Sequence, residues 1–299
     1  MDDGAQIAVR RWSAPKKRRL LVSHGNGMAV DAFYPFAEAL FDSFEVIAFD
    51  LRSHGNSPRV PHPETPWPRY IADIPQIFEG IEQLFGTCET HGAFHSMASV
   101  STLCAQTFKP SPWASLTLFE PPITPSDDKE IRETFNAVQQ IMGARALRRR
   151  RTFSDPSVLA ASFRRAATFD GVSDSTLGRL AIGSVFRSGE SVDEPWELVL
   201  PPEAEASNFS QATGLTAYWD ALVGIRTPIQ IVTGDPATHD LPNLVDIARH
   251  MSKSFGYPVS KIPNTNHFMQ LQEPLLCAEK VRDFALTSAE HTNSVQQEI

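Results

Sequence analysis

Short apolar runs alternate with amphipathic helical segments at both ends of this chain, and this alternation limits the folds open to it. In the first third, runs rich in β-forming residues cover 19–25, 44–50, 91–95 and 114–120. Between them, apolar residues recur at helical spacing over 31–43, 71–85 and 97–108. Strands that alternate with helices predict an α/β fold with a mostly parallel sheet and helices on both faces.

The middle of the chain breaks this alternation. From Pro121 to about residue 215, helical patterns follow one another without convincing strands, over 129–151, 156–167 and 174–187. Strand and helix patterns return at 227–234, 243–255, 258–264 and 274–286. The simplest interpretation is an α/β core built from residues 1–122 and 216–299, with a helical cap or lid inserted at 123–215.

Composition and charge narrow the possible partners. The 299 residues are 41% hydrophobic, and their formal net charge of −8 argues against a general nucleic-acid binder. The three cysteines are too few and too scattered for a disulfide framework or a zinc site. The sequence shows neither a secretory signal nor an apolar run of the roughly 18 residues that span a bilayer. We therefore expect a cytoplasmic protein, monomer or homodimer, that acts on a small molecule.

Three polar segments follow predicted strands, at the sheet edge where open α/β sheets bind ligands. They are His24-Gly25-Asn26-Gly27, the turn around Ser96, and the loop around His267. The turn, HGAFHSMASV, nearly matches the Gly-x-Ser-x-Gly pattern of a serine nucleophile. Phe94 and Ala98 hold the two glycine positions, so the match is incomplete.

Together with residues 49–58, these segments resemble the α/β-hydrolase fold family in order and spacing. The resemblance covers most of 19–122 and 227–285, and the insertion lies where that family carries its cap. It implies that Ser96 is the nucleophile and His267 the general base. It also implies an oxyanion hole formed by the backbone N–H groups of Asn26 and Met97. The site lining would include His24, Gly25, Gly27 and His95.

Elementary chemistry leaves a simpler interpretation open for each of these residues. A serine hydroxyl is a poor nucleophile unless a base removes its proton, and Ser96 could instead cap a buried helix. His267 could be structural, although its place in the last strand-to-helix loop favours the base. The segment from His24 to Gly27 could be a plain glycine-rich turn. His24 is expected to organise that loop, and His95 to line the pocket floor or pack structurally.

The carboxylate that would orient His267 has several candidates. The commonest position in the family corresponds to Ala237, which cannot serve, while Asp235 comes early and Asp240 late. A smaller group, which includes some lipases, lactonases and acyl-CoA hydrolases, takes the acid from the strand after the nucleophile. Glu120 stands there, and a carboxylate at an apolar strand end is costly to bury unless it is paired. We favour Glu120 and keep Asp235 and Asp240 as alternatives.

The resemblance and these residues predict a serine hydrolase without metal or organic cofactor. It would cleave a small to medium hydrophobic ester, thioester or lactone through an acyl-enzyme. A C–C bond hydrolase or an amidase could use the same triad, and a non-catalytic receptor could keep the same fold. The run Arg148–Arg151 is more typical of a solvated helix face than of a grip on an anionic group such as the phosphates of coenzyme A.

Overall fold

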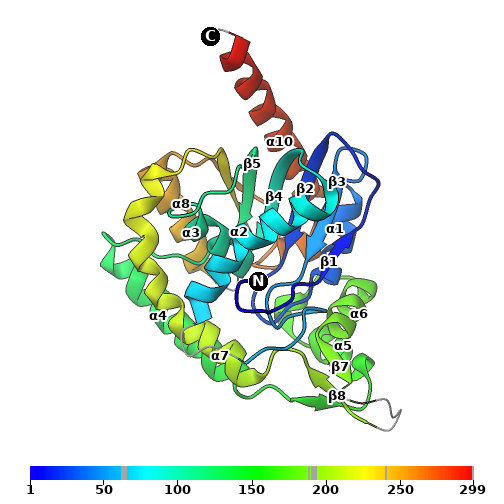
Figure 1. Ribbon diagram of the computed structural model, residues 1–299. Coiled ribbons are helices and arrows are strands. Elements are labelled where there is room, and N and C mark those ends of the chain that lie inside the picture. The colour runs from blue at the N-terminus through cyan, green and yellow to red at the C-terminus, as the bar shows by residue number, and fades with distance from the viewer. Residues whose placement is uncertain (62–65, 188, 190–193, 240, 298–299) are drawn as a thin grey trace.

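The computed structural model describes residues 1–61, 66–187, 189, 194–239 and 241–297 (Figure 1). Within these residues, a central seven-stranded sheet has the order β1-β3-β2-β4-β5-β9-β10. Only its edge strand β1 pairs antiparallel, on β3, and every other pairing is parallel. The strands are Val9–Arg11, Arg18–Ser23, Glu45–Phe49, Glu89–His95 and Ser115–Phe119 for β1 to β5, then Ile229–Thr233 for β9 and Val259–Lys261 for β10. The predicted α/β fold with a mostly parallel sheet is confirmed.

Helices cover both faces of the sheet, and alternate strand residues feed two separate hydrophobic clusters. In β2, Leu21 packs in one cluster, while Leu20 and Val22 pack in the other. The first cluster is covered by α2 (Pro66–Phe85), α3 (Met97–Ala105) and α8 (Pro242–Phe255). The second is covered by η1 (Val30–Phe33), α1 (Tyr34–Glu38), α9 (Met269–Gln272) and α10 (Pro274–Gln297). Figure 1 shows the red end of α10 projecting beyond the sheet.

Residues 123–215, called the insert below, hold four α-helices and three short strands in the part that the structure describes. The helices are α4 (Lys129–Ala146), α5 (Pro156–Arg164), α6 (Asp174–Gly183) and α7 (Pro202–Gln211). The strands β6 (Thr152–Phe153), β7 (Val185–Arg187) and β8 (Trp196–Leu198) form an antiparallel sheet. The sequence showed no convincing strand in this segment, because strands of two or three residues are too short to show a periodic pattern.

The insert forms two groups of elements. Helices α4 and α7 pack against each other, and α5 packs on α6 (Figure 1). Helix α6 also contacts η1 of the core. The treatment of the insert as a separate cap domain stays a prediction. None of the described helices, in the core or the insert, is both long and apolar enough to cross a membrane.

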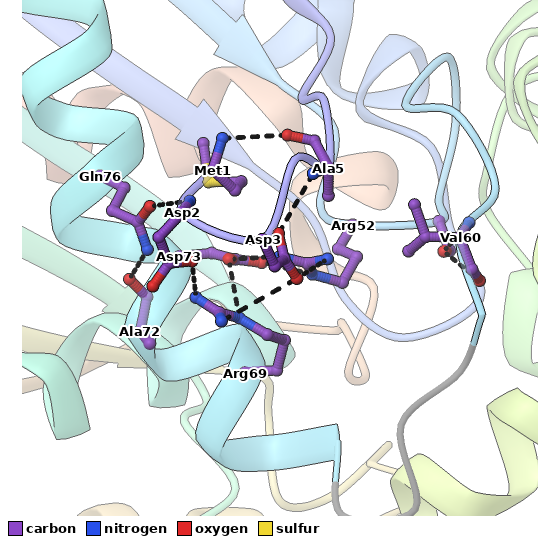
Figure 2. A network of polar contacts seen from close by, with 11 residues as sticks. Met1, Asp2, Asp3, Ala5, Arg52, Val60, Arg69, Ala72, Asp73 and Gln76 are labelled. Carbon is purple, nitrogen blue, oxygen red and sulfur yellow. Dashed lines mark hydrogen bonds and ion pairs between the residues drawn. The ribbon is translucent and has the colours of Figure 1, made fainter.

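Ion pairs link the N-terminal residues to Arg52 and to α2, as Figure 2 shows. The guanidinium of Arg52 donates to both carboxylate oxygens of Asp73, at 2.8 and 2.7 Å, and to Asp3 at 2.8 Å. Arg52 and Asp73 are both buried, so each compensates the charge of the other. This pairing holds the turn after β3 against α2.

Candidate active site

Ser96 is the single residue between β4 and α3, and its backbone is strained. Its φ of 50° lies in the left-handed region that residues other than glycine rarely adopt. The Ser96 N–H donates to the carbonyl of Phe119 at 2.8 Å, which ties the turn to the neighbouring strand β5. Among the described residues, the Ser96 side chain caps no N–H of α3. The geometry is that of a sharp strand-to-helix turn with its hydroxyl free of a capping role.

Phe94 takes the place of a glycine in the serine pattern, and its ring is accommodated in the core. The ring is fully buried, with its centroid 5.9 Å from that of Phe49 and 5.5 Å from that of Trp113. Gly92 leaves the space for it, since a Cβ there would come within 2.4 Å of the Phe94 ring. A bulky residue is therefore compatible with this turn because a glycine two residues earlier in the strand makes room.

His267 lies against Glu120, which follows the end of β5. The imidazole Nδ1–H donates to Oε2 of Glu120 at 2.6 Å. The N–H of Gly234 donates to Oε1 at 2.8 Å, and the carboxylate is wholly buried. Burial alone would raise the pKa of Glu120, but hydrogen bonds from His239 and His267 outweigh it and lower the pKa to about 2. Glu120 is therefore ionised and holds one orientation of the His267 ring.

His239 also contacts this carboxylate, and sequence reasoning missed it. Its Nε2–H donates to Oε1 of Glu120 at 2.7 Å, while its Nδ1 accepts from the N–H of Leu241 at 2.8 Å. These two partners define the neutral tautomer with the proton on Nε2. His239 sits in the loop after β9, and the sequence analysis compared only the carboxylates of this loop. The histidine in the same loop could have indicated a second partner for the buried acid.

His95 contacts His267 through a hydrogen bond and through its ring. Its Nε2–H donates to the backbone carbonyl of His267 at 2.8 Å, and the two ring centroids are 4.5 Å apart. Complete burial and the nearby His267 lower the pKa of His95 to about 3, so the ring is neutral. Its Nδ1 has no hydrogen-bond partner among the described residues and faces Gly25. His95 borders the pocket and packs against His267, and its role in the site stays a prediction.

The loop from His24 to Gly27 is held on its core side by two histidines. His24 donates from Nδ1 to the carbonyl of Gly25 at 2.8 Å and accepts at Nε2 from the N–H of Leu51 at 3.1 Å. Gly27 adopts a φ of 70°, and its N–H donates to Nε2 of His54 at 3.1 Å. His24 thus links the loop to the residues that follow β3.

The same loop is held on its other side by the insert. The Asn26 side chain donates to the carbonyl of Glu205 at 3.0 Å and accepts from Nδ2 of Asn208 at 2.9 Å, both in α7. Glu205 in turn pairs with Arg149 of the arginine run. The Asn26 side chain is thus engaged by the insert. Met97 opens α3, where the first N–H groups lack a partner within their own helix.

Asp235, one of the two alternative acids, has partners other than His267. The carboxylate of Asp235 accepts from the N–H groups of Ala237 and Asn264, both at 3.2 Å, and from Lys261 at 3.3 Å. Hydrogen bonds from these backbone groups lower the pKa of Asp235. Asp240 lies outside the described residues. The catalytic role of any of these carboxylates stays a prediction.

The candidate residues border one pocket of about 670 Å³, counted with its open mouth. It is lined by Ser96, His267, His95 and the loop residues Gly25 and Asn26, together with Met97. Most of the remaining wall is apolar and comes from core and insert, with Met28, Trp67, Val138, Met142, Phe209 and Leu244 among its members. A lining of this kind fits an apolar group.

The buried cluster of Glu120, His239 and His267 also consists of residue types that bind metal ions. One atom from each of Glu120, His239 and His267 lies within 4.8 Å of the others. The nitrogen–oxygen distances of 2.6 and 2.7 Å are those of N–H donors on a carboxylate. A zinc ion with its ligands at about 2.0–2.2 Å would have to replace both protons and push these atoms apart. We therefore interpret the cluster as hydrogen bonded.

Comparisons with known proteins give a consistent result. The sequence model described as "Alpha/beta hydrolase family" matches residues 20–280. No curated protein matches the chain significantly. Among solved structures, E-2-(acetamidomethylene)succinate hydrolase is similar with a TM-score of 0.70 and 19% identity, over 94% of this chain and 95% of that one.

Two further structures are similar to the same extent. The thioesterase domain from the curacin biosynthetic pathway has a TM-score of 0.68 and 18% identity, covering 94% of this chain and 96% of its own. A thermophilic esterase from Thermogutta terrifontis has a TM-score of 0.67 and 17% identity, covering 95% and 94%. At this level of identity, the likeness to solved structures shows the fold alone.

Proposed function

The chain belongs to the alpha/beta hydrolase family, and we propose that it is a serine hydrolase acting on a small to medium hydrophobic ester, thioester or lactone. The observation that carries this proposal is the 2.6 Å hydrogen bond between Glu120 and His267, beside the pocket that Ser96 lines. A base oriented by a buried carboxylate next to a strained serine is the arrangement that acyl transfer requires.

The first half of the reaction forms an acyl-enzyme. Ser96 Oγ attacks the substrate carbonyl carbon while Nε2 of His267 takes the hydroxyl proton. The N–H groups of Asn26 and Met97 hold the oxyanion, each donor contributing about 3 kcal/mol in a dry site. Glu120 stabilises the imidazolium. When the tetrahedral intermediate collapses, the bond to the leaving group breaks and His267 returns its proton to that group.

The second half releases the acid. A water molecule loses a proton to His267 and attacks the acyl carbon, and the new oxyanion occupies the same hole. Collapse breaks the bond to Ser96, whose oxygen recovers the proton from His267. The neutral tautomer of His95 fits this cycle, because a second charged imidazole 4.5 Å away would oppose protonation of His267.

The test is hydrolysis of p-nitrophenyl esters of increasing acyl length by wild type, Ser96→Ala and Glu120→Gln. We expect many turnovers by wild type, and a loss of several orders of magnitude for Ser96→Ala with the fold retained by circular dichroism. Asp235→Asn is the matched control and should stay near wild type, because its carboxylate bonds to Ala237 and Asn264 rather than to His267. A wild type that reacts once and stops would favour a receptor instead.

A further inference from the structure

We propose that the leaving-group half of the substrate occupies a second cavity next to the active-site pocket and carries a carboxylate that faces Arg145. This inference rests on the proposed function, because it assigns the two halves of a cleaved ester to two cavities. It goes further by naming the charge of one half.

The second cavity is larger than the first and shares part of its wall. Its volume is about 1160 Å³, counted with its mouth, and the insert contributes α4 to α7 and the short 3-10 helix η2 (Ala167–Phe169) to its walls. Both cavities are bordered by His267, Phe268, Asn26 and Met28. Ser96 and Met97 border only the first. The two spaces are therefore neighbours that meet at His267.

This division orients the substrate. The carbonyl carbon has to lie at Ser96 with its oxygen toward Met97 and Asn26, so the acyl half belongs to the first pocket. The leaving oxygen has to face His267, which protonates it as the bond to the carbonyl carbon breaks. From there the leaving group can extend into the second cavity, which His267 borders and Ser96 does not.

The walls of the second cavity combine an apolar surface with one uncompensated cation. The rings of Phe163, Phe169 and Phe268 contact one another in a row, with centroids 5.1 and 4.7 Å apart, and the second pair is stacked. Arg145 and Arg149 also line the cavity. Arg149 is paired with Glu205, whereas no carboxylate of the described residues forms an ion pair with Arg145. One positive charge is therefore left over.

The charge of Arg145 is opposite in sign to the formal net charge of the chain, which is −8. A single guanidinium at the rim of an apolar cavity matches one carboxylate at the end of an apolar chain, whereas a phosphate dianion would need a second cation. Arg145 is exposed, so we expect a moderate preference that salt weakens.

The experiment uses pairs of butyrate esters that differ only in the charge of the alcohol. In each pair the alcohol is an ω-hydroxy acid or its primary amide, and the chains have four, six and eight carbons. Three lengths are used because the distance from His267 to Arg145 decides which chain brings the carboxylate to the guanidinium. For at least one length we expect kcat/KM to be about fivefold higher for the carboxylate at low salt. Arg145→Gln should remove this preference and leave the amide esters within about twofold of wild type. Arg148→Gln, which removes a charge outside the cavity, should keep it.

The outcomes separate the inference from the proposed function. Ser96-dependent cleavage of the amide esters without any carboxylate preference overturns the inference and leaves the function standing. A preference that survives in Arg145→Gln also overturns it. Hydrolysis of no ester at all contradicts the proposed function. In that case titration calorimetry of the same pairs on Ser96→Ala still decides the inference, since equal affinity for carboxylate and amide overturns it.

Discussion

The carboxylate of Glu120 is shared by two histidines, and His239 donates to its Oε1 at 2.7 Å while His267 donates to its Oε2 at 2.6 Å. Glu120 itself is held with a φ of 45° at the end of β5. The donors on Oε1, His239 and the N–H of Gly234, fix the carboxylate plane and draw charge away from Oε2. We therefore expect His239 to act on His267 through Glu120, as a positioning residue.

Replacing His239 should move the pH dependence of the reaction. In His239→Phe one of the hydrogen bonds that lower the pKa of Glu120 is gone, so the pKa of this carboxylate rises. Catalysis needs Glu120 ionised, so we expect kcat/KM of the variant to begin falling at a higher pH, on the acid side, than that of wild type. His239→Gln keeps an N–H donor and should restore most of the wild-type profile. If both variants lose rate but keep the pH profile of wild type, His239 has a structural role alone.

Glu120 should make stability depend on acid pH. Its folded pKa of about 2 lies below the ordinary value of 4.5, so its stabilising contribution is complete above that value and is lost as the pH falls toward 2. The shift corresponds to on the order of 3 kcal/mol. We expect the unfolding free energy of wild type to exceed that of Glu120→Gln at neutral pH. Denaturant titrations should show this difference shrinking between about pH 5 and about pH 3. A constant difference would contradict the assignment.

Gly25 should tolerate no side chain. A Cβ there would come within 2.9 Å of Nδ1 of His95 and 3.1 Å of Cβ of Ser96. Gly25→Ala must push the loop and the serine turn apart, which we expect to cost about 1–3 kcal/mol of stability and most of kcat. Gly80→Ala in α2 is the control, because its Cβ would meet no atom within 4 Å. Thermal unfolding and ester hydrolysis measure both effects, and wild-type activity in Gly25→Ala would refute the packing argument.

Asn208 should couple the insert to the oxyanion loop. Its buried amide donates to Asn26 at 2.9 Å, and its backbone carbonyl accepts from the indole N–H of Trp67 at 2.9 Å. Asn208→Ala leaves the Asn26 side chain with one partner fewer, so the loop loosens. We expect kcat to fall by about tenfold with a smaller change in KM. Ser210→Ala, an exposed change in the same helix, should have no effect. Equal losses in the two variants would point to α7 as a whole instead.

The alternation of apolar runs with helical patterns was enough to predict the parallel core. It also predicted that Ser96 and His267 lie in connections that follow strands of this core. These features are local, because periodicity over a few residues decides which face of a strand or helix is buried. The strands of the insert escaped prediction because each has only two or three residues. Edge strand β1 escaped for the same reason.

The sequence alone therefore determined the fold class. It also predicted the site at Ser96 and His267, together with a short set of candidate acids. Only the tertiary structure decided which carboxylate meets His267. Glu120, 147 positions away in the sequence, reaches it because β5 lies between β4 and β9. It also decided that His239 shares that carboxylate and that the insert holds Asn26. The physical reason is that hydrogen bonds between distant residues depend on strand order and loop geometry, which leave no periodic trace in the chain.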